Sequence, residues 1–185
     1  ELFHASAVWE KLDRPRICVQ PVNHKGVKPA KAVWRGTNAI PSWSWRGCEG
    51  NPAVVEVYIS AAKVELTLNG KSLGMKKVKN CKAVFRTKYT PGTLTAIAFD
   101  ASGREIGRDC LQSAGTDLKA AAFPEKEAYE KGEITYVPIC IADGKGTIES
   151  NADRKLIVSA EGGELLGFGS ANPRTEERFD TGEHT

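Results

Sequence analysis

Strict alternation of apolar and polar residues begins near Ala53, and it limits the folds open to this chain more than any other feature. In residues 54–60 (VVEVYIS) the apolar positions Val55, Val57 and Ile59 lie two residues apart. Residues 63–68 (KVELTL) repeat the pattern. Successive side chains of a strand point to opposite faces, so this spacing predicts half-buried β-strands with one apolar face.

Turn residues separate these runs at short intervals. Asn69 and Gly70 directly follow the second run, and both tolerate positive φ, which predicts a tight hairpin. Further strands are predicted over residues 83–89, 93–99 and 105–111, with turns at 90–92 and 100–103. Short strands with turn signals about every 8–12 residues are typical of an antiparallel sandwich. We therefore predict an Ig-like β-sandwich over residues 41–113.

A second β module is predicted after a polar joint at residues 113–117. Its strands are expected over residues 118–123, 134–142, 156–160 and 165–168. That is fewer than the roughly seven strands of an Ig-like sandwich. The predicted fold class is therefore all-β, with two tandem Ig-like antiparallel β-sandwich modules, of which the second (114–185) is incomplete.

The first 40 residues differ from the rest and are predicted to be an irregular N-terminal segment. Residues 5–12 suit a short helix, which Pro15 would end because proline cannot donate a backbone hydrogen bond. One strand is predicted over residues 17–20. The remainder, with four prolines between residues 15 and 41, is predicted to be a long connection.

Composition and charge exclude several classes of function. The chain has 26 Lys and Arg and 23 Asp and Glu, a net charge of +3, and these charges look well mixed along the sequence. No basic stripe is evident, so neither nucleic acid nor a membrane surface is predicted as a partner. The chain starts at Glu1, without an initiator methionine or a signal peptide, so we expect it to derive from a longer polypeptide.

Cysteine and histidine are too scattered for a metal site. No C-x-x-C pair occurs and there are only three histidines, so neither a metal nor a cofactor is predicted. An odd set of scattered cysteines suits free thiols, which favours a reducing, cytoplasmic compartment. The five cysteines are Cys18, Cys48, Cys81, Cys110 and Cys140.

Three stretches together resemble one enzyme family. Residues 41–47 (PSWSWRG) resemble the Pro-His-Trp-Asn-Trp-x-Gly start of a domain that follows a catalytic barrel. Residues 64–74 (VELTLNGKSLG) are similar to the hairpin of that domain, and residues 163–173 (GELLGFGSANP) to a segment of the last domain. The family is glycoside hydrolase family 2, in its β-galactosidase-like members. Ser42 and Ser44 depart from the pattern, because they replace the usual histidine and asparagine.

The resemblance implies a non-catalytic role. In this family the two catalytic glutamates lie on a (β/α)8 barrel, and Ig-like domains follow the barrel. Residues 1–40 would then be the connecting segment from an upstream barrel of the same polypeptide, the main expected partner. No catalytic residue is expected in this chain, and the parent enzyme would hydrolyse O-glycosidic bonds.

Four tryptophans are the remaining candidates for a site. Trp43 and Trp45 share one face of an extended segment, and two readings are open. Exposed, they could stack on sugar rings as a carbohydrate-binding site, and buried, they would pack in the core or against the barrel. Trp9 and Trp34 are predicted at the barrel interface.

Other motifs have ordinary structural explanations. The acidic residues of the stretch 125–133 lie among lysines and are predicted to form a solvated, charged loop. The Gly167-Phe168-Gly169 step lacks the rest of a dinucleotide-binding motif and suits a turn. Cys48 could react only if it were exposed. The competing functions are an accessory structural region, a carbohydrate-binding module and an Ig-like protein-interaction module, with self-association also possible.

Overall fold

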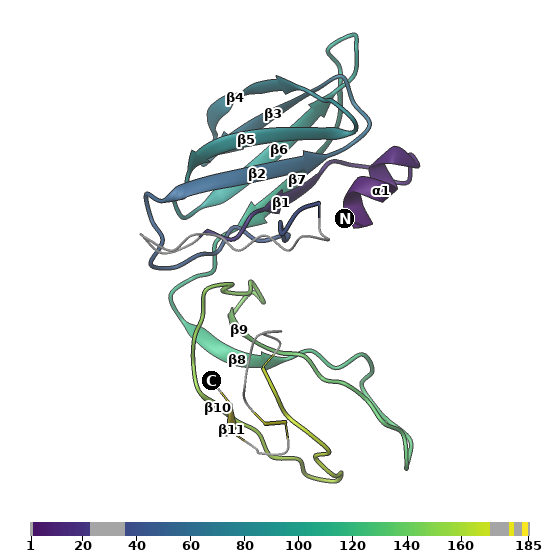
Figure 1. Ribbon diagram of the computed structural model, residues 1–185, viewed down its shortest axis with the longest axis vertical. Helices are drawn as coiled ribbons and strands as arrows, with labels where there is room; N and C mark the ends of the chain where they lie inside the picture. The colour runs from purple at the N-terminus through teal and green to yellow at the C-terminus, as the bar shows by residue number, and fades with distance from the viewer. Residues whose placement is uncertain (1, 23–35, 171–177, 180–182, 185) are drawn as a thin grey trace. The chain divides into compact units, whose positions relative to one another are not determined.

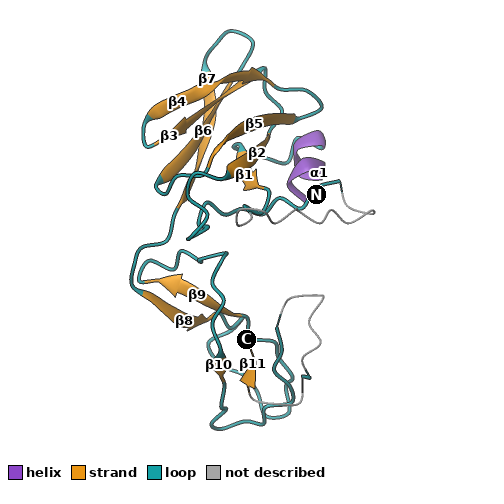
Figure 2. Ribbon diagram, turned by 60° about the vertical axis from the view of Figure 1, so that its left-hand side comes forward, coloured by secondary structure: helices purple, strands orange, loops and turns teal. Residues whose placement is uncertain are grey.

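The computed structural model describes residues 2–22, 36–170, 178–179 and 183–184. The chain forms two compact units, residues 1–151 and residues 152–185, and Figure 1 labels the helix and strands. Strands account for nearly all of the regular structure in these ranges, beside the short helix α1 (Figure 2). The described residues include no helix that is long and apolar enough to cross a membrane.

The first unit begins with a helix and continues as strands. Its elements are α1 (Leu2–Val8), β1 (Arg16–Val19), β2 (Pro52–Tyr58), β3 (Lys63–Leu68), β4 (Lys71–Lys77), β5 (Lys82–Lys88), β6 (Thr93–Phe99), β7 (Glu105–Gln112), β8 (Leu118–Ala122) and β9 (Ile139–Asp143). One sheet has the order β1-β2-β5 and the other β4-β3-β6-β7, with every pair antiparallel. The two sheets enclose one apolar core, so these seven strands form a sandwich.

The core consists of the residues that the alternation placed on one face. Val55, Val57, Val64 and Leu66 are fully buried, and β5 and β6 add their own inward residues. The inward residues of β5 and β6 are Ala83, Phe85, Leu94, Ala96 and Ala98. The all-β antiparallel class is thereby confirmed.

The hairpin between β3 and β4 forms where the sequence places it. Asn69 and Gly70 have φ values of 50° and 78°, as the tight turn requires. The side chain of Asn69 accepts a hydrogen bond from Thr93 N at 2.8 Å. Gly92 (φ 139°) must be glycine here, because an added Cβ would lie 2.0 Å from the Asn69 side-chain oxygen.

The N-terminal segment contributes a strand to the sandwich. β1 pairs with β2 along its whole length, from Arg16 opposite Tyr58 to Val19 opposite Val55. Its backbone is also held by β7, because Ile17 N donates to an Asp109 carboxylate oxygen at 2.9 Å. The strand predicted over residues 17–20 is therefore confirmed within one residue, and it pairs with a strand of the sandwich.

The helix predicted over residues 5–12 lies further towards the N-terminus. α1 ends at Val8, and Glu10 takes a φ of 53°. Lys11 N donates to Ser6 O at 2.8 Å and Glu10 N to Ala7 O at 3.2 Å, which is the Schellman pattern of a helix end. The prediction was wrong at this boundary because the cap uses Glu10 in a conformation usually taken by glycine.

A short β8–β9 hairpin completes the first unit. β9 starts at Ile139 rather than at the predicted residue 134. The turn after it is held by Asp143, whose Oδ1 accepts hydrogen bonds from Lys145 N and Thr147 N, each at 2.9 Å. Glu149 N then donates to Ile141 O at 2.9 Å, so the chain runs back along β9.

The second unit contains less regular structure than predicted. β10 (Leu156–Ile157) pairs with β11 (Glu183–His184), whereas residues 165–168 form no strand. Gly169 lies so close to Phe179 that an added Cβ would be 1.9 Å from its ring. Close backbone approach explains this glycine better than a binding motif does. The boundaries 1–40, 41–113 and 114–185, and the incompleteness of the second module, stay predictions.

Candidate functional site

Residues 41–47, here called the strap, have a buried centre that consists of Trp43, Ser44 and Trp45. Trp43 is 0% exposed and Trp45 is 4% exposed. The Trp43 indole nitrogen donates to Thr90 O at 3.0 Å, and its ring meets the Tyr89 ring edge-on at a centroid distance of 5.0 Å. Such an edge-on pair stabilises the core beyond the area that it buries.

Two hydroxyl groups attach the strap to the first sandwich. Trp45 N donates to the Tyr89 hydroxyl at 3.0 Å. The Ser113 hydroxyl donates to Trp43 O at 2.5 Å and accepts from Gly92 N at 3.1 Å. The strap backbone is therefore paired to side chains on the sandwich, although it belongs to neither sheet.

Glu149, which follows β9, holds the strap from the other side. Its side chain is buried, with 5% of the residue exposed. One carboxylate oxygen accepts from the Ser44 hydroxyl at 2.7 Å, and the other accepts from Arg46 N at 3.0 Å and Asn151 N at 3.1 Å. We call the Glu149 carboxylate and the groups that bind it the junction. Its hydrogen bonds are strong, because charge-assisted hydrogen bonds are stronger than neutral ones.

Further contacts join the same two segments. The Ser150 hydroxyl donates to the Ser42 hydroxyl at 2.6 Å, and the Asn151 side chain donates to Arg46 O at 2.7 Å. Ser44 also accepts from Ala114 N at 2.9 Å. Of the two residues that replace the family's usual histidine and asparagine, Ser44 is thus part of the junction and Ser42 binds the residue next to Glu149.

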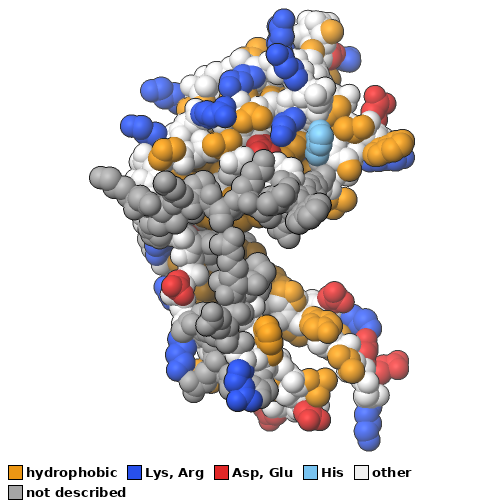
Figure 3. Space-filling model, viewed as in Figure 1, with side chains coloured by type: hydrophobic (Ala, Val, Ile, Leu, Met, Phe, Trp, Pro, Cys, Tyr) orange, Lys and Arg blue, Asp and Glu red, His pale blue; other side chains and the backbone are white. Residues whose placement is uncertain are grey.

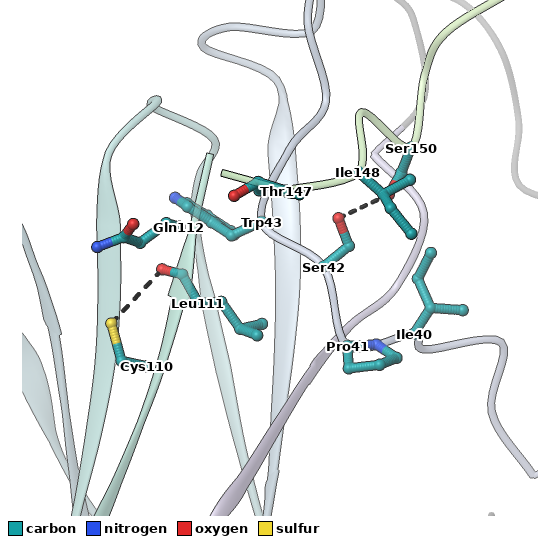
Figure 4. A pocket seen from close by; sticks show the side chains of 11 residues that line it. Ile40, Pro41, Ser42, Trp43, Cys110, Leu111, Gln112, Thr147, Ile148 and Ser150 are labelled. Carbon is teal, nitrogen blue, oxygen red and sulfur yellow. Dashed lines mark hydrogen bonds between the residues drawn. The ribbon is translucent and has the colours of Figure 1, made fainter. Parts of the chain in front are cut away.

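An open pocket of about 690 Å³ lies beside the junction (Figure 4). Its walls come from the strap, the end of β7 and the turn after β9. Its lining residues are Ile40, Pro41, Ser42, Trp43, Cys110, Leu111, Gln112, Gly146, Thr147, Ile148 and Ser150. None of these lining residues carries a carboxyl or imidazole group.

A second buried carboxylate, Glu56, lies on the outer face of the first sheet. It is 3% exposed. One oxygen accepts from the Gln20 amide at 2.8 Å and the other from the Tyr58 hydroxyl, while Lys82 Nζ lies 3.9 Å away. Burial by itself raises the pKa of Glu56. The opposite effect of its hydrogen bonds from Tyr58, Gln20 and Thr37, together with the positive charge of Lys82, is larger. The pKa of Glu56 is therefore below its usual value.

The helix α1 covers part of this outer face. Ala7 packs with Cys18 and Tyr58, and the His4 imidazole contacts Asn80 O at 2.9 Å. The opposite side of the helix is open, where Leu2 and Trp9 are each 75% exposed and Val8 is 53% exposed. Leu2, Val8 and Trp9 are here called the Trp9 face.

The structure brings together only some of the residues that the sequence singled out. Trp43 and Trp45 are buried, which agrees with packing, so sugar binding by this pair stays a prediction that would need the rings to become exposed. The Trp45 indole nitrogen has no hydrogen-bond partner among the described residues. Trp34 lies outside the described residues, and a barrel contact of Trp9 also stays a prediction.

The other candidates are structural. Burial raises the pKa of the Cys48 thiol, helped by the charges of Glu49 and Glu149, and the residue is 0% exposed, so it is no reactive nucleophile. The acidic loop is exposed, with Lys126 paired to Glu133. Across the described ranges, no group of three His, Cys, Asp or Glu side chains could hold a metal ion.

Glu149 and Glu56 are the two residues that sequence reasoning missed. Glu149 contacts Ser44 across 105 positions of sequence, and no local pattern distinguishes it from a surface glutamate. Glu56 offered a faint signal, because it lies between Val55 and Val57 in a strand that is apolar on both sides. Strands covered on both faces are otherwise continuously apolar, so a single acid there suggests a buried, paired group.

Comparison with known proteins identifies relatives of this chain. A family described as "Domain of unknown function (DUF4982)" matches residues 50–107, from just before β2 into β7. The β-galactosidase BoGH2A of Bacteroides ovatus is 29% identical over 146 residues, which are 76% of this chain and 17% of that protein.

Solved structures of glycosidases also resemble this chain. A glycosyl hydrolase family 2 (GH2) member from Bacteroides cellulosilyticus has a TM-score of 0.77 and 28% identity, covering 98% of this chain and 25% of that one. A β-glycosidase from Bacteroides vulgatus has a TM-score of 0.67 over 98% of this chain and 21% of that one; at 24% identity it supports the fold alone. The resemblance to glycoside hydrolase family 2 is confirmed, and the chain spans a quarter or less of these relatives' length.

Substitution of Glu149 tests the junction. Glu149→Ala leaves the Ser44 hydroxyl and two backbone donors unpaired, so the free energy of unfolding should fall by about 2–4 kcal/mol. Glu149→Gln keeps one acceptor and should cost less. Chemical denaturation measures both, and hydrogen exchange should show the Arg46, Ala114 and Asn151 amides losing protection. The exposed Glu127→Ala is the control; equal losses for Glu127→Ala and Glu149→Ala would contradict the junction.

Substitution of Glu56 tests its depressed pKa. A carboxyl with a lower pKa in the folded state contributes stability above its unfolded pKa of about 4.3, and this is lost as the pH falls through the folded pKa. In Glu56→Gln, the free energy of unfolding should therefore fall less steeply than in the wild type as the pH is lowered below about 4.3. Urea denaturation over a pH series measures this, and an unchanged acid limb would show that Glu56 does not contribute.

Proposed function

We propose that this chain, which is similar to one part of the family 2 glycoside hydrolases, is a non-catalytic accessory region of such an enzyme. The polypeptide that contains it would hydrolyse β-galactosides or related O-glycosides through a catalytic barrel upstream. The chain itself would support that barrel and do no chemistry.

The observation that carries this proposal is the way in which the chain matches its relatives. Almost all of the chain, 98%, aligns with only 25% of the Bacteroides cellulosilyticus structure. A region of that size leaves most of the relative, including room for a catalytic domain, outside the match. The curated relative is a β-galactosidase, which favours galactosides as the substrate class.

The chemistry of the buried acids supports the same view. Retaining glycoside hydrolysis needs two carboxyl groups about 5–5.5 Å apart that are free to act on substrate. Both oxygens of Glu149 already accept hydrogen bonds from the chain's own donors, and so do both oxygens of Glu56. These two carboxylates therefore serve the fold and have no spare oxygen facing a substrate.

The Trp9 face is our candidate for the contact with the barrel. Leu2, Val8 and Trp9 are large apolar side chains gathered on one short helix and its end, and all three are more than half exposed. Exposed apolar clusters on soluble proteins commonly mark interfaces. The helix itself is anchored on its other side, so the exposed residues are presented from a fixed support.

Hydrolysis of chromogenic substrates tests the main proposal. The purified 185-residue chain should release no nitrophenol from nitrophenyl β-galactoside above the buffer rate, whereas the polypeptide that includes the upstream region should hydrolyse it. The β-glucuronide and β-mannoside serve as controls for substrate class. Turnover by the chain alone would disprove the non-catalytic role, and an inactive longer polypeptide on all three substrates would disprove the enzyme assignment.

Footprinting tests the Trp9 face. Hydroxyl-radical oxidation followed by mass spectrometry should modify Trp9 several-fold less in the longer polypeptide than in the chain alone, because the barrel would cover it. Met75, which is 52% exposed on β4, is the internal control and should be oxidised equally in both. Equal oxidation of Trp9 in the two samples would place the barrel contact elsewhere.

A further inference from the structure

Basic residues are concentrated in one stretch of the chain, although the charges look mixed over its full length. Residues 50–90 contain eight lysines and arginines but two acidic residues, an excess larger than the net charge of +3 of the whole chain. The eight basic residues are Lys63, Lys71, Lys76, Lys77, Lys79, Lys82, Arg86 and Lys88. We call these residues the basic face.

Six of the eight residues lie on two strands that meet at one edge of the sandwich: Lys71, Lys76 and Lys77 on β4, and Lys82, Arg86 and Lys88 on β5. β4 is the edge strand of one sheet and β5 the edge strand of the other. The two edges are neighbours, because Lys76 Nζ donates to Val84 O at 2.6 Å and lies 5.3 Å from the centre of the Phe85 ring. Figure 3 shows lysine and arginine side chains gathered over this upper part of the first unit.

The two acidic residues of the stretch leave most of this charge unneutralised. Glu56 is buried and paired with Gln20 and Tyr58, with Lys82 at 3.9 Å. Glu65 accepts a hydrogen bond from the Ser72 hydroxyl at 2.6 Å. Within the part of the chain that the structure describes, the basic face forms one salt bridge, between Lys82 and Glu56.

Like charges even oppose each other across the strands. Lys63 lies directly across from Lys77, and Lys79 and Lys82 face each other in an isolated bridge. Like charges in directly opposed positions are destabilising. Lysines do protect sheet edges from pairing with other chains, but charges of either sign do that, and opposed lysines are not required. The surplus of one sign therefore suits an anionic partner.

We propose that the basic face binds a linear acidic polysaccharide, one that carries carboxylate or sulfate groups along its length. This rests on the proposed function, in which the polypeptide acts on carbohydrate. Two neighbouring edge strands present cations in extended rows, which match a chain of repeated anions. Tyr58, Phe85 and Tyr89 are buried, so these aromatics offer no platform on which nucleic-acid bases could stack.

A lipid surface fits less well. Helices and patches that bind membranes combine basic residues with several apolar side chains that enter the lipid. Met75 is the large hydrophobic residue of β4 and β5 that is exposed. The face is thus charged with little apolar surface, as recognition of a hydrated polyanion requires.

Affinity electrophoresis tests the proposal with two matched variants of the 185-residue chain. The first is the triple variant Lys77→Gln, Lys79→Gln, Lys88→Gln on the basic face. The control is Lys11→Gln, Lys131→Gln, Lys145→Gln, which removes the same charge from exposed positions elsewhere. Native gels containing polygalacturonate should retard the wild-type chain, and neutral dextran should not. Retardation should weaken as salt is added, because the contacts are between exposed charges.

The two variants should separate clearly. The basic-face variant should bind polygalacturonate about tenfold or more weakly, since each lost charge contact costs part of the affinity, whereas the control should stay within about twofold. Equal weakening of both variants, or no retardation of the wild type, would overturn the proposal. Tighter binding to duplex DNA or to phosphatidylglycerol vesicles than to polygalacturonate would overturn the choice of partner.

This test is independent of the enzyme assignment. Binding is measured on the chain alone, and hydrolysis on the longer polypeptide. A longer polypeptide that hydrolyses glycosides while the chain ignores polygalacturonate would refute the basic-face proposal alone. Specific binding by the chain with no hydrolysis by the longer polypeptide would refute the enzyme assignment alone.

Discussion

The buried carboxylate of Glu149 is the interaction on which the arrangement of the first unit depends. Moving a charge out of water is costly unless hydrogen-bond donors surround it. Three donors surround Glu149: the Ser44 hydroxyl and Arg46 N from the strap, and Asn151 N. Because the donors sit on segments far apart in sequence, satisfying the charge fixes where those segments meet. The strap is in turn held to the sandwich through Tyr89 and Ser113, so the β8–β9 hairpin is coupled to the sandwich by polar contacts.

Local sequence predicted the parts of the fold that local forces determine. The alternation around Val55 and Val57 and the Asn69-Gly70 turn specify strands and a hairpin with little help from elsewhere, and both formed as expected. The end of α1 was misplaced because Glu10 adopts a positive φ that residues other than glycine rarely take, so the sequence does not mark the helix end there. Glu149 was missed for a different reason: its role exists only once Ser44, 105 residues away, is beside it.

The surface charge also depends on both the local sequence and the tertiary fold. The chain as a whole is nearly balanced, with 26 basic and 23 acidic residues, but residues 50–90 hold eight basic residues and two acidic ones. Folding strengthens this local excess, because Glu56 turns inward while most lysines of β4 and β5 stay outside on adjoining edges. Partner classes judged from net charge alone are therefore less informative for a sandwich, in which a few strands make up an entire edge.

Strand β1 has a consequence for how this module can be inherited. The matched family region starts at residue 50, yet the sheet it describes gains its outer strand from residues 16–19. A gene rearrangement that moved residues 50–107 into another protein would leave β2 with an unpaired edge, which invites pairing with foreign strands. The unit of evolutionary exchange is thus larger than the unit of sequence similarity, and the segment before the strap must travel with the sandwich.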